Sequence, residues 1–200
     1  MKNIILTIAA AAALLLASCQ KTIIDKGEKD GFLSFAEFSL GLDESLITKA
    51  DAAGGNYAII INDAEGMEVM RKTYDEVRNA GNLLTLPAGN YTLVARSVGE
   101  DVPFAAFERP IYGTSRNFTI VAGQETTIGE LVCTLLQCKV TVEYSDEFLE
   151  CVTGAGSTTV TLSEGHPLEY ALNADKTYEH QAGYFAVNGS TMTVVFKGNI

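Results

Sequence analysis

Short segments rich in apolar residues, several of them with an apolar residue at every second position, recur along most of this chain, and they predict an all-β protein. In residues 191–197, the side chains of Met192, Val194 and Phe196 would share one face of a strand, and those of Thr191, Thr193 and Val195 would share the other. Residues 91–97 show the same period of two. The expected strands cover residues 31–40, 56–61, 67–74, 83–86, 91–97, 117–121, 125–136, 138–144, 158–162, 168–172, 178–187 and 191–197.

Turn-forming residues separate these runs at short intervals, and no long amphipathic helix interrupts them. Residues 75–80 form the one short stretch expected to be helical, and residues 41–55 form a long loop. Many short strands divided by turn signals favour β-sandwiches. We therefore expect a first β-sandwich domain over residues 31–136 and a second over residues 137–200. The second range is short for a sandwich of about 100 residues, so it is a fragment, a small domain, or an incomplete domain that borrows a strand.

The N-terminus follows a different pattern from the rest of the chain. Lys2 precedes an apolar run from Ile4 to Ser18, which has the length of a signal peptide and is too short to span a bilayer. The run ends in Leu-Ala-Ser-Cys at residues 16–19, which resembles the lipobox of bacterial lipoproteins. The resemblance implies that residues 1–18 are removed and that Cys19 carries the lipid. An ordinary secretory signal followed by a chance cysteine is the alternative.

The lipobox resemblance also implies a location. Gln20, not Asp, follows Cys19, and in Gram-negative lipoproteins this permits sorting to the outer membrane. Residues 19–30 are mostly polar and are expected to form a flexible tether. The protein is then a lipid-anchored outer-membrane protein on the cell surface or on the periplasmic face, with the membrane as its first partner.

Charge and composition argue against nucleic acid as a partner and against catalysis. The 182 residues left after removal of the signal carry a formal charge of −12, because Lys2 leaves a chain whose net charge is −11. No basic patch stands out. The two histidines, His166 and His180, lie far from the cysteines in sequence, and no acid–base or metal constellation can be assembled from these two distant residues. We expect no enzyme activity, no cofactor and no metal site.

Three cysteines remain in the mature chain besides the lipid-bearing one. Cys133 and Cys138 stand in apolar runs, and Cys151 follows further on. We expect buried thiols, with a disulfide from Cys138 to Cys151 as the alternative.

A family resemblance rests on three motifs taken in order. These are Gly-Phe-Leu-Ser-Phe at residues 31–35, Leu-Pro-Ala-Gly-Asn-Tyr-Thr-Leu-Val-Ala at residues 86–95, and Phe-x-x-Pro-x-Tyr-Gly at residues 107–113. The chain resembles Bacteroidales lipoproteins of unknown function in the fimbrillin-like superfamily. The resemblance implies tandem transthyretin-like (Greek-key) β-sandwiches. It also implies a fimbrillin-like structural or adhesin subunit without catalytic activity, joined to other fimbrial subunits by strand donation.

Fimbrillins are cut in an early loop by a trypsin-like protease before they assemble. The matching region here is residues 46–51, where Lys49 is the only basic residue between Asp30 and Arg71. The resemblance thus implies maturation at Lys49, although fimbrillins commonly have Arg at this place. An exposed loop with a solvated lysine is the alternative.

A second function remains open alongside the fimbrial one. The chain would then be a monomeric glycan- or protein-binding outer-membrane lipoprotein. Phe104, Phe107 and Tyr112, with Phe118 nearby in sequence, could form an aromatic patch that stacks on a host or glycan ligand. The alternative is that these side chains fill the core.

Overall fold

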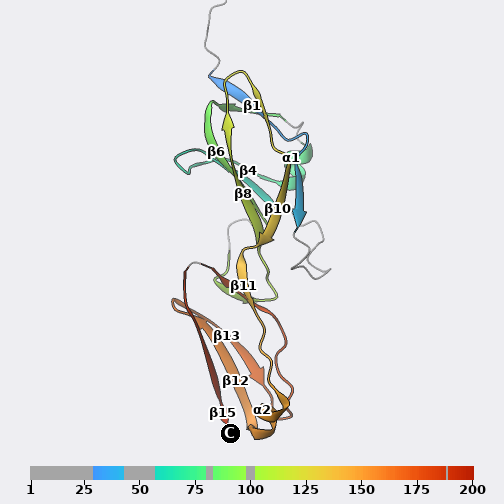
Figure 1. Cartoon of the computed structure of the whole chain (residues 1–200), viewed down its shortest axis with the longest axis vertical. Helices are drawn as coiled ribbons and strands as arrows, with labels where there is room; N and C mark the ends of the chain where they lie inside the picture. Colours follow the sequence, from blue (N-terminus) through green and yellow to red (C-terminus); the bar gives the residue numbers. More distant parts are fainter. Residues whose placement is uncertain (1–28, 43–56, 80–82, 98–101, 188) are drawn as a thin grey trace, which may run out of the picture.

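The computed structural model describes residues 29–42, 57–79, 83–97, 102–187 and 189–200. These residues form an elongated all-β molecule in which one group of sheets follows the other along the long axis (Figure 1). The all-β expectation is confirmed. The strands are β1 Asp30–Ser34, β2 Ser39–Leu42, β3 Ala58–Asn62, β4 Glu68–Thr73, β5 Leu83–Pro87, β6 Gly89–Arg96, β7 Ala105–Phe107, β8 Tyr112–Ile120, β9 Glu125–Thr127, β10 Glu130–Leu135, β11 Gln137–Val140, β12 Thr153–Leu162, β13 Gly165–Leu172, β14 Gly183–Ala186 and β15 Met192–Asn199; the helices are α1 Tyr74–Asn79 and α2 Asp146–Cys151.

The first sandwich packs a six-stranded sheet against a three-stranded one. The large sheet has the order β2-β10-β8-β6-β3-β4, and the small sheet has the order β5-β1-β9. Strand β6 shows why the residues arrange in this way: Tyr91, Leu93 and Ala95 are buried, and the residues between them are more exposed. The core between the sheets contains Leu33, Phe35, Phe38, Tyr57, Ile59, Ile61, Val77, Leu86, Tyr91, Leu93, Ala95, Tyr112, Ile120, Ile128, Leu131 and Cys133.

Helix α1 closes one side of this core and matches the helix expected at residues 75–80. Thr73 and Glu76 form a reciprocal cap: the Glu76 backbone N–H donates to Thr73 Oγ1 at 3.2 Å, and Glu76 Oε2 accepts from the Thr73 backbone N–H at 2.7 Å. The Thr73 backbone N–H and hydroxyl both donate to Glu76 Oε2, and these two hydrogen bonds lower the pKa of the Glu76 carboxyl. Val77, on the inner side of the helix, is buried in the core.

The second sandwich brings the sheet β11-β14-β7 together with the sheet β13-β12-β15. Val160, Leu162, Tyr170 and Phe185 form its buried centre. Strand β7 lies within the range expected for the first sandwich, but it pairs with β14 and packs against this second core. Residues of β7, which precede the expected boundary after residue 136, thus contribute to the second core. The boundary itself stays a prediction.

Several elements differ from those expected. The run at 31–40 is divided into β1 and β2, and the run at 178–187 is a strand only over β14. The run at 138–144 leaves its sheet after Val140. Helix α2 lies between the strands expected at 138–144 and 158–162, where no helix was expected, and Ser145 caps it by accepting from the Phe148 backbone N–H at 3.3 Å.

The cysteine expectation was right for one residue and wrong for another. Cys133 is fully buried in the first core, but Cys138 is exposed, as is Cys151. The reason is strand alternation: on β11 Gln137 takes the buried position, so the next side chain faces outward. All three thiols are free, so the alternative Cys138–Cys151 disulfide is absent.

Candidate binding groove

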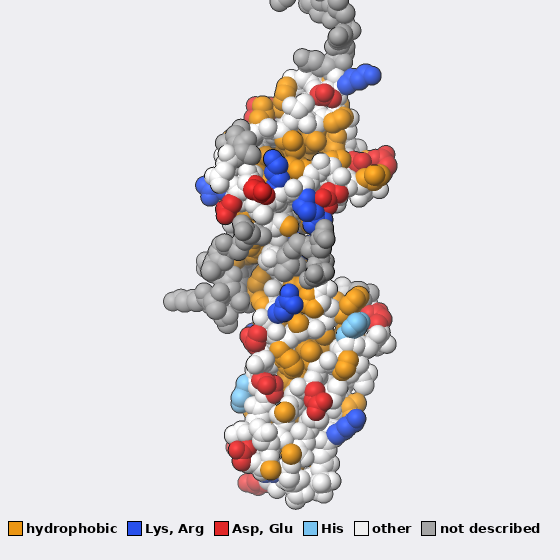
Figure 2. Space-filling model, turned by 180° about the vertical axis from the view of Figure 1, so that it is seen from behind, with side chains coloured by type: hydrophobic (Ala, Val, Ile, Leu, Met, Phe, Trp, Pro, Cys, Tyr) orange, Lys and Arg blue, Asp and Glu red, His pale blue; other side chains and the backbone are white. Residues whose placement is uncertain are grey.

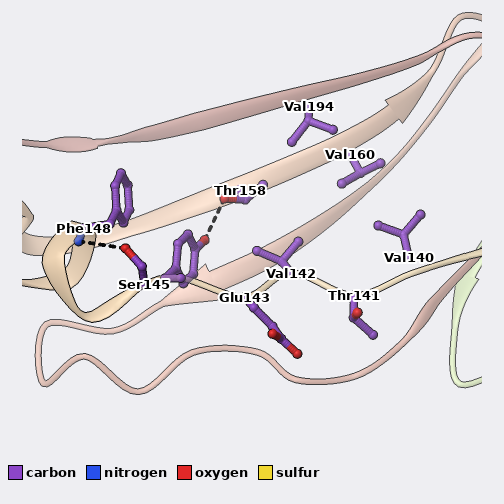
Figure 3. A pocket seen from close by; sticks show the side chains of 10 residues that line it. Val140, Thr141, Val142, Glu143, Ser145, Phe148, Thr158, Val160 and Val194 are labelled. Carbon is purple, nitrogen blue, oxygen red and sulfur yellow. Dashed lines mark hydrogen bonds between the residues drawn. The ribbon is translucent and has the colours of Figure 1, made fainter.

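An open groove of about 440 Å³ runs along the second sandwich, and we call it the β15 groove. Strands β12 and β15 form its floor, and the chain from Val140 onward forms its wall (Figure 3). The lining is mostly apolar, and Glu143 is its only charged side chain. It consists of Val140, Thr141, Val142, Glu143, Tyr144, Ser145, Phe148, Thr158, Val160 and Val194.

The floor of the groove contains an apolar side chain without a cover. Val160 on β12 and Val194 on β15 are register partners, so both point to the same side of the sheet. Val160 is only 1% exposed, but Val194 is 64% exposed. Met192 and Phe196, on the same face of β15, are half-buried. Side chains of the sandwich core therefore cover β12 at Val160, but they leave the middle of β15 exposed at Val194.

The wall of the groove is held to the sheet at two points. The Tyr170 hydroxyl donates to the Val140 carbonyl at 3.1 Å, and the hydroxyls of Tyr144 and Thr158 lie 2.6 Å apart. Between these points, the backbone of residues 141–143 makes no backbone hydrogen bond to another strand in the described part of the chain. The wall is thus fixed in place, and its backbone groups remain available for pairing.

Aromatic side chains lie at the α2 end of the groove. Tyr144 stacks on Phe148 with their ring centroids 5.4 Å apart, and Phe148 meets Phe196 edge to face at 5.0 Å. Burial of such pairs fixes the position of α2 against β15. The groove therefore has a rigid end and a defined direction along β15.

Strand β15 is an edge strand, with β12 as its only sheet neighbour among the described strands. Its outer edge offers unpaired backbone N–H and C=O groups beside an apolar surface. An extended peptide could add to this edge and place alternate side chains over Val194 and Val142. The arrangement is suited to strand addition.

Features that would indicate other chemistry are missing from the described residues. No group of three or more His, Cys, Asp or Glu side chains there could hold a metal ion, and no helix there is long and apolar enough to cross a membrane. On the face shown in Figure 2, Lys and Arg side chains lie scattered among acidic ones. The β15 groove is the arrangement with the clearest binding geometry.

The three aromatic residues expected to form a patch are not brought together. Tyr112 is 4% exposed and lies in the first core, whereas Phe107 packs edge to face on Tyr170 near the second core. Phe104 is 48% exposed and stacks on His166 with ring centroids 4.4 Å apart. Only Phe104 of the three is an exposed aromatic side chain, so the three residues do not form one patch, and Tyr112 fills the core as the alternative had it.

The other two site residues expected from the sequence, Cys19 and Lys49, lie outside the described residues. The β15 groove itself was not expected as a site. Its signal was the alternation of Val140, Val142 and Tyr144. The alternation was interpreted as a paired strand, which concealed the open edge.

Comparison with known proteins assigns a family. The model of the family called "Domain of unknown function (DUF4493)" matches residues 31–200. The chain belongs to this DUF4493 family. The match begins at β1 and includes both sandwiches and the whole β15 groove. Among curated proteins, none matches the chain.

Solved structures from Bacteroides resemble this DUF4493 chain in fold. A putative adhesin from Bacteroides ovatus is 9% identical with a TM-score of 0.47, and the match covers 84% of this chain and 71% of that one. A structure described as putative polysaccharide binding proteins (DUF1812), from Bacteroides thetaiotaomicron, has the same identity and TM-score, with coverage of 84% and 76%. A second putative adhesin from Bacteroides ovatus is 11% identical with a TM-score of 0.39, with coverage of 88% and 69%.

Proposed function

We propose that this protein is a lipid-anchored, non-catalytic cell-envelope subunit of the fimbrillin-like kind, which joins another subunit by accepting its strand in the β15 groove. The proposal rests on the pair Val160 and Val194. These register partners lie on the same face of the sheet, but Val160 is buried and Val194 is exposed. Fully burying a valine contributes about 1.5–3 kcal/mol. A strand that covered Val194 would gain part of this energy and would also pair with the free edge of β15.

The first sandwich supports a maturation step at Lys49. Strands β1 and β2 both precede this residue, and β1 is the central strand between β5 and β9. Leu33 on β1 is fully buried in the core. Cleavage at Lys49 would leave this segment held only by non-covalent contacts. Its departure would open an apolar slot between β5 and β9, so that one subunit could accept strands in both sandwiches.

The membrane anchor rests on the N-terminal sequence. The lipobox-like run that ends in Cys19 supports attachment to the outer membrane by lipid, and residues 20–28 would separate the anchor from β1. Three acyl chains, as bacterial lipoproteins usually carry, would hold the protein far more firmly than one. The sandwiches would then project from the membrane surface.

The test is proteolysis of intact cells that express the full chain, followed by mass analysis of the anchored and released products. We expect external trypsin to cut at Lys49, and the protein then to run as a ladder of oligomers. The variant Lys49→Ala should remain uncut there and should form no ladder, and Val194→Asp should be cut but should assemble poorly. Monomers after complete cleavage at Lys49 would contradict the proposal, as would protection until the outer membrane is broken.

A further inference from the structure

Two Asn-x-Thr triplets face each other on the outer surface of the large sheet. One is residues 90–92 on β6, and the other is residues 117–119 on the antiparallel strand β8. Their register pairs each asparagine with the threonine of the other triplet. Thr92 Oγ1 donates to Asn117 Oδ1 at 2.9 Å, and Thr119 Oγ1 donates to Asn90 Oδ1 at 2.9 Å. The four side chains therefore form one ordered polar ladder.

The ladder leaves a defined set of hydrogen-bonding groups toward solvent. Each asparagine uses its carbonyl oxygen within the ladder, and neither side-chain NH₂ group donates to any residue that the structure describes. Each NH₂ group carries two donors, and each threonine hydroxyl retains acceptor capacity. Because Tyr91 and Phe118 alternate with these residues and pack toward the core, the ladder lies on the opposite face of the sheet.

A pocket of about 500 Å³ lies over this ladder, with Asp63 and Ala64 of the β3–β4 turn along one side. This volume is in the range of about 300–1,000 Å³ found for small-ligand sites. Asp63 is held in place because its Oδ1 accepts backbone N–H groups from Glu65 at 3.1 Å and Met67 at 2.8 Å. Its second oxygen makes no hydrogen bond with the described residues, so the pocket adds a fixed carboxylate acceptor to the amide donors.

This combination favours a ligand whose groups both donate and accept, and sugar hydroxyls do so. An anionic ligand would be repelled by Asp63 and Glu65. Burial raises the pKa of Tyr91 beside the pocket, and the negative charges of Asp63, Asp30 and Glu65 raise it further. An apolar peptide finds little to bury on a surface of amides and hydroxyls. We propose that the pocket formed by Asp63 and the Asn90–Thr119 and Thr92–Asn117 pairs binds a neutral saccharide.

This saccharide site is independent of the proposed strand addition. It lies on the first sandwich, whereas the β15 groove lies on the second. Loss of one should therefore leave the other unchanged, and the two proposals can fail separately.

The test is a printed array of neutral and acidic oligosaccharides probed with the mature chain, followed by calorimetric titration of the strongest binder. The informative variant is the double substitution Asn90→Ala and Asn117→Ala. The control is Asn173→Ala, since Asn173 Nδ2 also hydrogen-bonds a threonine hydroxyl, that of Thr177, at 2.9 Å on the surface of the other sandwich. Thermal unfolding of each variant shows whether it folds.

We expect binding to at least one neutral glycan. The double variant should weaken it at least 10-fold and the control should leave it unchanged, while both variants unfold cooperatively. If the double variant unfolds, the variant Thr92→Val is used in its place, because it removes one hydroxyl at constant shape. It should weaken binding about 3-fold or more. The proposal is overturned if the folded protein binds no neutral glycan on the array, prefers acidic glycans, or binds equally well after these substitutions.

Discussion

The hydroxyl of Tyr170 holds the wall of the β15 groove to its floor, and its removal gives a sharp test of the second sandwich. The side chain is almost fully buried, and its hydroxyl donates to the Val140 carbonyl at 3.1 Å. Tyr170→Phe keeps the ring and leaves that carbonyl without this donor. A buried polar group that loses its partner costs about 1–3 kcal/mol. Val140 is only half-buried, so we expect the low end, about 1 kcal/mol.

A second buried tyrosine provides the matched control. Tyr57 lies in the first core, and its hydroxyl makes no hydrogen bond within the described ranges of the chain. Tyr57→Phe removes the same atom and should cost less than about 0.5 kcal/mol. Burial raises the pKa of both tyrosines, that of Tyr57 to about 12, so both hydroxyls stay protonated near neutral pH. The difference between the variants should therefore not depend on pH there.

The assay is urea unfolding of the mature chain and its two variants, followed by circular dichroism. In a thermal scan, about 1 kcal/mol corresponds to a shift of roughly 2–4 °C for a chain of this size. If Tyr170→Phe unfolds at the same urea concentration as the parent chain, the hydrogen bond does not hold the wall. Equal losses in both variants would mean that the cost comes from the core in general.

Three further predictions address other parts of the molecule. Ile59→Ala should cost about 2–5 kcal/mol in urea unfolding, because Ile59 is fully buried in the first core; a loss below 1 kcal/mol would contradict the packing. Iodoacetamide at neutral pH should label the exposed Cys138 and Cys151 but not Cys133, by mass spectrometry. Burial raises the pKa of the Cys133 thiol from 9.0 to about 11. The stability that this buried, protonated thiol contributes is therefore intact below pH 9, and it is lost as the pH rises toward 11. Cys19→Ala should abolish labelling by radioactive palmitate and release the protein from membranes, whereas continued labelling would exclude Cys19 as the lipid site.

The sequence predicts strands well where one face of a sheet is buried. Along β6, Tyr91, Leu93 and Ala95 face the core as their period of two indicates, because burial on one face imposes that period. The α1 helix was also predictable, since Thr73 and Glu76 form a cap within one turn. These features depend on residues that are close together in sequence.

Features that depend on distant residues could not be predicted in the same way. Residues 141–144 have the alternation of a strand, but whether a strand finds a partner is decided by the rest of the sheet. Strand β7 joins the second core through β14, a partner almost 80 residues away. For Tyr112 an exposed patch and a place in the core both stayed open, because an aromatic residue in a loop-rich stretch gives no sign of which side it faces; Tyr112 is 4% exposed.

Photo-crosslinking from β15 tests strand addition most directly. Val194 faces the β15 groove, and its neighbour Val195, 43% exposed, faces the opposite side of the same strand. Benzoylphenylalanine at each position, in cells that express the full chain, gives two probes that differ only in the face they occupy. The account predicts subunit-to-subunit crosslinks from position 194 and few from position 195, with the crosslinked peptide mapping to an extended apolar segment. Equal crosslinking from both positions, or none from position 194, would contradict it.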